Sequence, residues 1–328
     1  MKFRTLIACL TALVAGLFAL SLVTGVAPVG PGESYAALLR DDGGPLTMVM
    51  REIRLPRAIL AVMIGVSLGL SGAAMQGFLR NPLAEPGLIG VSSSAALGAV
   101  LALQTGFAAA FALALPVAAL VGAGIGVALI LFLAGPGGGA FTLILAGIAL
   151  SALTGALTSL VLNLSPNPFA ANEIVFWMMG SLADRSFDHV WMALPVMAVG
   201  WLALARTGRG LEALTLGEDA AASMGFDLSR LRLILLGGVA ASVGAATAVA
   251  GAIGFVGLVV PHLLRPLVGG RPSRLLLASA LGGAALVLAA DVAVRMVLPG
   301  RDLKLGVLMA LVGAPVFLHL IWRRRGQS

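Results

Sequence analysis

The chain has 328 residues, of which 59% are hydrophobic and only 11% are charged, and its mean hydropathy is +1.05. A water-soluble surface needs roughly 25% charged residues, so this composition excludes a soluble globular protein and indicates a polytopic integral membrane protein. The formal net charge is +7. The basic residues are nearly all arginines in short gaps between apolar runs, which favours a role in membrane topology and excludes a nucleic-acid surface. The single cysteine, Cys9, excludes an intramolecular disulfide and a zinc site built from cysteines.

Apolar runs predict about ten membrane spans, because a spanning helix needs about 20 apolar residues. In chain order they cover residues 3–24, 57–77, 89–103, 108–133, 141–162, 189–205, 231–251, 254–267, 275–297 and 305–322. The third and eighth runs are the short ones. The sequence therefore predicts an all-α polytopic membrane protein with a single transmembrane domain over residues 1–328.

The positions of the basic residues predict the orientation of the spans. The first run follows Lys2 and Arg4, and we interpret it as a retained span because no convincing cleavage site follows it. With ten spans and a cytoplasmic amino terminus, Arg80, the loops 206–232 and 265–274 and the terminal arginines 323–325 fall on the cytoplasmic side. Both termini are then expected to be cytoplasmic.

Three arginines break this pattern and fall on the outer side, at a spacing of three residues: Arg51, Arg54 and Arg57. If the segment is helical, they lie on one face. One interpretation is that they contact an acidic partner. The other is that their side chains snorkel to the interface at the start of the second span.

Asp291 and Arg295 are an ionisable pair inside the ninth span. Their spacing of four residues allows them to pair, which reduces the cost of about 2.5–3.5 kcal/mol for a charge at the bilayer centre. A structural ion pair is the simpler account of Asp291. Arg295 is nearer to the outer interface and is also placed to meet a partner.

The largest predicted inner loop, residues 206–230, contains the signals of a short helix. Thr215 and Glu218 have the spacing of a capping box, and Gly225 is placed to end the helix, which predicts a helix over about 216–224. Such a helix suits a cleft on a cytoplasmic partner, or else it is an ordinary helix on the surface of the loop. One of its faces carries small or apolar side chains: Leu216, Ala220 and Met224.

Prolines and small residues indicate how the spans are broken and packed. Broken backbone that faces protein or a water-filled path is predicted at Asn81-Pro82, at Glu85-Pro86 and at Pro261. Small residues at spacings of three or four predict close helix packing in lipid. They are Gly65, Gly69 and Gly72 in the second span and Gly237, Ala241 and Ala245 in the seventh.

The sequence contains no evident catalytic centre. The histidines, at positions 189, 262 and 319, lie in separate spans without the spacing of a metal site. The glycine-rich turn 135–139 lacks the Lys-Ser/Thr pair of a phosphate-binding loop, so the chain is not expected to hydrolyse ATP by that route. Asp291 is almost alone as an embedded carboxylate, which disfavours an ion-coupled carrier.

Several blocks of the sequence resemble the FecCD-type permease family of ATP-driven importers for ferric siderophores, haem and cobalamin. They are RLPRAILAVMIGVSLGLSGAAMQGFLRNPLAEPGLIGVSSSAALGA, LTLGEDAAASMGFD, GAIGFVGLVVPHLLRPLVGG, and ADVAVR followed by LKLGVLMALVGAPVFLHLI. The resemblance covers nearly the whole chain. It implies a type II ABC importer permease of ten transmembrane helices in the bacterial inner membrane. Its implied partners are a second permease subunit, expected to be an identical copy, two cytoplasmic ATPase subunits and a periplasmic substrate-binding protein.

The same resemblance implies roles for particular residues. Arg54, Arg57 and Arg295 correspond to family arginines that contact acidic residues on the two lobes of the binding protein. The turn Asn81, Pro82 and Leu83 corresponds to the cytoplasmic gate region, with the turn 135–141 as the neighbouring gate loop. The loop helix corresponds to the element that couples the permease to the ATPase, and Asp219 stands where the similar EAA loop of importers has Glu. Its residues are Thr215, Gly217, Glu218, Asp219, Ala220, Ala221, Met224 and Gly225.

The implied function is that of a permease subunit that moves its substrate from periplasm to cytoplasm by alternating access. ATP is then used by the partner ATPase subunits, and no cofactor is expected in this chain. No residue distinguishes a ferric siderophore from haem or cobalamin, and the frequency of substrates in the family favours a ferric siderophore. The alternative is an ion-coupled secondary transporter or a channel.

Overall fold

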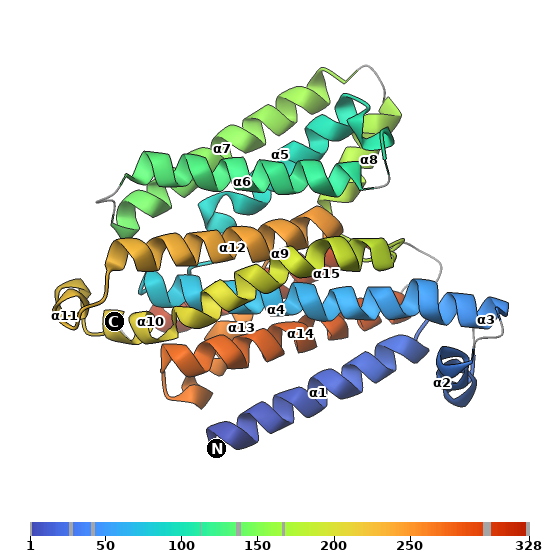
Figure 1. The fold of residues 1–328 in the computed structure, drawn as a ribbon, viewed down its shortest axis with the longest axis horizontal. Coiled ribbons are helices and arrows are strands. Elements are labelled where there is room, and N and C mark those ends of the chain that lie inside the picture. Colours follow the sequence, from blue (N-terminus) through green and yellow to red (C-terminus); the bar gives the residue numbers. More distant parts are fainter. Residues whose placement is uncertain are drawn as a thin grey trace.

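The computed structural model describes residues 2–25, 29–40, 43–111, 113–135, 139–165, 168–297 and 303–325. Helices connected by short turns make up these segments, and no strand occurs among them. The elements form an elongated bundle in which most of the long helices follow the long axis (Figure 1). The all-α prediction is therefore confirmed.

Seven helices in the described ranges are long and apolar enough to cross a membrane. They are α1 (Phe3–Val23), α4 (Leu55–Phe78), α6 (Ala114–Ala134), α7 (Ala140–Asn163), α9 (Phe187–Arg206), α12 (Leu228–Ala250) and α14 (Pro272–Val297). Two further apolar helices are α5 (Val91–Gln104) and α15 (Leu305–Arg325). The run at 254–267 forms α13 (Val256–Leu264) and the 3-10 turn η4 (Pro266–Val268), each too short to cross alone. The count of ten spans stays a prediction.

The remaining elements are short and, apart from one in the 206–230 loop, have no counterpart among the predicted helices. They are α2 (Pro31–Leu39), α3 (Pro45–Met48), the π-helix η1 (Val49–Arg54), the 3-10 turns η2 (Pro86–Ile89) and η3 (Phe107–Ala109), α8 (Pro168–Met178), α10 (Gly208–Leu214) and α11 (Glu218–Ser223).

The bundle has two distinct ends, which we call the α11 end and the α2 end. Figure 1 shows α10 and α11 at one end and α2 and α3 at the other, with both chain termini toward the α11 end. α1 follows one edge of the bundle, while α5, α6 and α7 form the opposite edge.

Small residues let α4 approach its neighbours closely. A Cβ added at Gly65 or Gly69 would lie 2.4 or 2.0 Å from a backbone oxygen of α14, and one at Gly72 would lie 2.0 Å from a backbone oxygen of α13. Only glycine permits such approach, so the predicted packing of this span is confirmed. In α12 the prediction is wrong for Gly237, which has nothing within 4 Å, while Gly238 faces a leucine of α9 instead; Ala245 is fully buried, as close packing requires.

Pro261 lies inside α13 and does not interrupt it, contrary to the prediction. Proline has no N–H, so the carbonyl of Gly257, four residues earlier, lacks its helical donor. Gln76 of α4 supplies a donor, because its Nε2 lies 3.3 Å from that oxygen, and its Oε1 accepts from Arg265 at 2.6 Å. The helix therefore continues through the proline. The break lies before the helix, where Phe255 has a φ of +67°.

Candidate functional site

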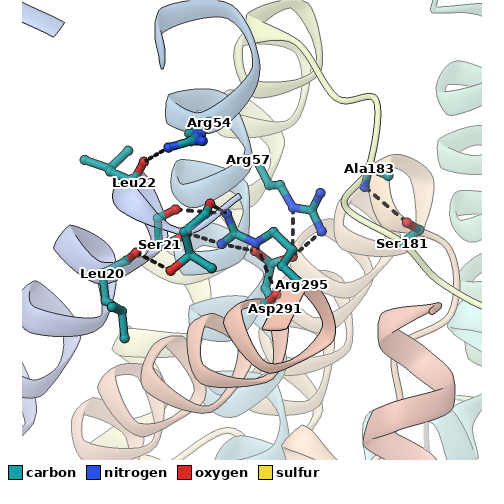
Figure 2. A network of polar contacts seen from close by, with 10 residues as sticks. Leu20, Ser21, Leu22, Arg54, Arg57, Ser181, Ala183, Asp291 and Arg295 are labelled. Atoms are coloured by element: carbon teal, nitrogen blue, oxygen red, sulfur yellow. Dashed lines mark hydrogen bonds and ion pairs between the residues drawn. The ribbon is translucent and has the colours of Figure 1, made fainter. Parts of the chain in front are cut away.

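The predicted docking arginines lie at the α2 end, but their charged groups contact other parts of the chain (Figure 2). Arg54 is only 5% exposed, and its Nη1 donates to the Leu22 carbonyl at the end of α1 at 3.0 Å. Arg51 Nε donates to the Leu38 carbonyl of α2 at 3.2 Å. A π-helix turns less per residue than an α-helix, so Arg51 and Arg54 on η1 diverge. The prediction that Arg51 shares one face with Arg54 and Arg57 is therefore wrong.

Asp291 is fully buried and holds two arginines. Arg57 Nε and Nη2 lie 2.9 and 2.8 Å from its Oδ1, and Arg295 Nη2 lies 2.7 Å from its Oδ2. The predicted pair of Asp291 and Arg295 is confirmed. Arg57, 234 residues away in sequence, is a partner that spacing within one span cannot reveal.

Arg295 also fastens α14 to the end of α1. Its Nη1 donates to the carbonyls of Ser21 and Thr24 at 2.9 and 2.7 Å, and its Nη2 donates to the Ser21 hydroxyl at 2.6 Å. The last carbonyls of a helix lack intrahelical donors and carry negative partial charge, which a guanidinium satisfies well. With Arg54 and Arg57, Arg295 and Asp291 form a cluster of arginines around one buried carboxylate, which joins α1, α4 and α14.

The predicted capping box in the loop is wrong. Thr215 Oγ1 donates to the Glu212 carbonyl at 2.7 Å, at the end of α10, and caps no N–H of α11. The chain turns after α10 through Gly217, whose φ is +108°. Because this turn separates Thr215 from the helix, α11 begins only at Glu218 and is shorter than predicted.

The end of α11 agrees with the prediction for Gly225. Its φ is +86°, its N–H donates to the Ala222 carbonyl at 2.9 Å, and the Phe226 N–H donates to the Ala221 carbonyl at 3.1 Å. These two bonds form a Schellman motif, in which a left-handed glycine closes the helix. Gly225 is confirmed as the residue that ends α11.

α11 presents both apolar and charged groups to its surroundings. Ala221 is fully buried and anchors the helix, whereas Met224 is 58% exposed, and Glu218 and Asp219 are also exposed. Glu218 lies 3.6 Å from Arg80, the second residue after α4. This ion pair places the end of α4 beside α11, at the same end of the bundle.

The predicted gate turn follows Arg80. The Asn81 side-chain oxygen accepts from the Leu83 N–H at 3.0 Å, and the Asn81 carbonyl accepts from the Ala84 N–H at 3.1 Å, so the turn that includes Pro82 is fixed by its own residues. In the neighbouring turn, residues 136–138 lie outside the described residues.

Glu85 is a partly buried acid at this turn for which the sequence predicts no partner. Its Oε1 accepts from the Phe255 N–H at 2.7 Å, at the break before α13, and it lines a cavity of about 170 Å³ together with Ser92. Burial raises the pKa of the Glu85 carboxyl, and the hydrogen bond from Phe255 opposes this rise. The contact joins the connection between α4 and α5 to the start of α13.

Comparison with known proteins agrees with this arrangement. The model of the FecCD transport family matches residues 12–323. The hemin transport system permease HmuU of Yersinia pestis is 42% identical, over 84% of each chain. The Fe(3+) dicitrate permease FecD of Escherichia coli is 37% identical, over 98% of this chain and 99% of FecD. A solved inward-facing structure of a metal-chelate type ABC transporter covers 98% of this chain and 99% of its own, with a TM-score of 0.85 and 30% identity. The chain therefore belongs to the FecCD transport family.

Proposed function

We propose that this permease takes up a ferric siderophore or a related bulky nutrient, haem or cobalamin, in a complex that hydrolyses ATP in partner subunits. The observation that carries the proposal is the match over nearly the whole chain, in sequence and in fold, to permeases of ABC importers. The relatives named above carry Fe(3+) dicitrate and hemin. The chain supplies a path with two gates, and no bond chemistry is assigned to it.

The α11 end is the cytoplasmic end in this proposal, and both termini are then cytoplasmic. Arginines gather at this end, as the positive-inside rule requires. They include Arg206, Arg209, Arg230, Arg271 and Arg274. α2 and α3 then lie on the periplasmic side of a bacterial inner membrane.

Each partner has a proposed surface on the permease. The two ATPase subunits bind at α11 of two permease copies, one for each subunit, where Met224 and Glu218 are exposed. The binding protein docks at the α2 end, where the cluster of Arg54, Arg57 and Arg295 lies around the buried carboxylate of Asp291. Arg57, with 18% of its side chain exposed, is the arginine that an acidic group of the binding protein reaches first.

α4 provides a mechanical link between these two surfaces. Arg57 contacts Asp291 near one end of the helix, and Arg80 pairs with Glu218 of α11 just after the other end. The 23 intervening steps along the chain correspond to roughly 34 Å at about 1.5 Å per residue. A shift of α11 driven by ATP in the partner therefore reaches the docking end through one tightly packed helix.

The coupling role is tested by Met224→Asp, which places a charge on the exposed apolar part of α11. Met296→Asp is the matched control, because Met296 at the end of α14 is 63% exposed and Met224 is 58% exposed. We expect Met224→Asp to reduce copurification of the ATPase at least tenfold and the control to leave it unchanged. If equal amounts of the ATPase copurify with the two variants, the assignment of α11 as the ATPase-binding element is wrong.

The docking role is tested by Arg57→Gln in the reconstituted complex, with Arg40→Gln at the exposed end of α2 as control. We expect weaker binding of the binding protein and a smaller stimulation of ATPase activity, together with a shallower dependence of binding on salt. Unchanged stimulation by the binding protein, with the variant folded, overturns the docking role of Arg57.

A further inference from the structure

An open apolar groove lies at the edge of the bundle that α1 forms. Its volume is about 380 Å³, and α1, α13 and α14 line it with leucine, valine, alanine and glycine side chains only. Leu13 on α1 and Leu263 on α13 are 51% and 56% exposed, so the groove opens to the surroundings of the bundle. In a membrane those surroundings are lipid acyl chains.

Basic side chains gather where α1 and α14 begin, at the α11 end of the same edge. Lys2 and Arg4 precede or begin α1, and Arg271 and Arg274 precede or begin α14. The Arg274 guanidinium lies 5.2 Å from the centre of the Phe3 ring, which brings the two helix starts together. Within the described part of the chain, none of these four side chains forms an ion pair.

No acidic residue of the groove helices faces this basic group. α1 and α13 contain no Asp or Glu, and the first acidic residue of α14 is Asp291, near the opposite end of the bundle. Glu212 of α10 lies nearby and accepts a hydrogen bond from the Ser273 hydroxyl. The potential at this corner is therefore positive, and it favours an anion.

The spacing between the basic residues and the groove is the same on both helices. The groove begins eight residues, or roughly 12 Å along a helix, after the basic residue on each helix: at Leu10 after Lys2, and at Gly282 after Arg274. The groove ends fifteen residues, or roughly 22 Å, after the same basic residues: at Leu17 on α1 and at Ala289 on α14. One leaflet extends roughly 20–22 Å from its polar surface to the bilayer midplane. The groove thus lies at the depth of acyl chains when the basic residues lie at the depth of phospholipid headgroups.

We propose that this edge binds an anionic phospholipid, with an acyl chain in the groove between α1, α13 and α14 and the headgroup phosphate at Lys2, Arg4, Arg271 and Arg274. Basic pockets between transmembrane helices on the cytoplasmic side favour anionic headgroups. Leu267 in η4 is 47% exposed and continues the apolar surface from the groove toward the headgroup. The bound lipid fills the groove beside α1 and so supports the packing of this helix on the bundle.

The test measures lipid retention by the purified permease alone, so its outcome does not depend on the proposed transport function. Phosphatidylglycerol and phosphatidylcholine are added in equal amounts, and bound lipid is counted by native mass spectrometry. The variant Arg4→Gln with Arg271→Gln removes two exposed charges at the headgroup position, whereas Arg206→Gln with Arg230→Gln removes two at the same end on other helices. We expect the first variant to bind phosphatidylglycerol about thirtyfold more weakly and the second to bind it like the wild type.

A second variant tests the groove itself. Ala289→Phe places a ring in the space that the acyl chain occupies, and Ala289 is only half-buried, so the ring has room to form without disturbing the core. We expect this variant to lose bound phosphatidylglycerol at an unchanged unfolding temperature in lipid-free detergent. Equal retention of the two lipids by the wild type, unchanged retention after loss of Arg4 and Arg271, or full retention by Ala289→Phe overturns the proposal.

Discussion

Asp291→Asn is the substitution that tests the arginine cluster most severely. Asp291 is fully buried, and the side chains of its partners Arg57 and Arg295 are only 18% and 10% exposed. Asparagine keeps the size of the side chain but removes the negative charge, so two largely buried guanidinium groups lose their counter-ion. Breaking a buried pair in this way costs about 3–5 kcal/mol. Arg295 keeps its contacts with Ser21 and Thr24, so we expect a loss near the lower value, about 3 kcal/mol.

The assay is thermal unfolding in detergent, followed by tryptophan fluorescence. At about 2.1 cal/mol/K of unfolding entropy per residue, a loss of about 3 kcal/mol corresponds to a fall in unfolding temperature of about 4 °C for a chain of 328 residues. Glu52→Gln is the control, because Glu52 is an exposed acid of the same region, and we expect no measurable change. The triple variant Arg57→Met, Asp291→Leu and Arg295→Met removes all three charges at once, and it should recover much of the unfolding free energy that Asp291→Asn loses. An unchanged unfolding temperature for Asp291→Asn would show that Asp291 does not stabilise the buried arginines.

Three further predictions concern backbone and burial. Gly69→Ala should sharply lower the unfolding temperature, because its Cβ would lie 2.0 Å from the Ser279 oxygen, whereas Gly16→Ala, with nothing within 4 Å, should raise it slightly. Gly225 has a φ of +86°, so Gly225→Ala should destabilise the end of α11 by about 1–2 kcal/mol. We expect this variant to be expressed like the wild type but to copurify with less ATPase, and unchanged copurification contradicts this. Because burial raises the pKa of Glu85, the wild type loses stability as pH rises through that pKa. Glu85→Gln should therefore equal the wild type near pH 4 and exceed it in unfolding temperature near pH 8, and parallel pH profiles argue against this.

Features carried by local pattern are predictable from the sequence. The long apolar runs become α1, α4, α7, α9, α12, α14 and α15, with ends that differ by a few residues from those predicted. The glycines of α4 predict its close packing, because a missing Cβ has a direct steric consequence. Asp291 and Arg295 pair as predicted, because both lie on one helix at a spacing of four.

Features that depend on tertiary contacts are not predictable in this way. Arg57 finds Asp291 across 234 residues, and no spacing rule indicates that pair. Thr215 has the sequence of a capping box but ends α10 instead, because Gly217 turns the chain before α11 begins. Pro261 does not break α13, because Gln76 of a distant helix supplies the missing donor. For Arg57 and Pro261 the deciding partner is remote in sequence, whereas for Thr215 the turn at Gly217 decides between two locally reasonable conformations.

ATP-driven import of a bulky nutrient is the function proposed for this permease. The most direct measurement is uptake into proteoliposomes that contain the permease with its ATPase, with and without the binding protein, against ferric siderophores, haem and cobalamin. We expect one of these substrates to accumulate only when both ATP and the binding protein are present. Uptake driven by an ion gradient without the ATPase would contradict it.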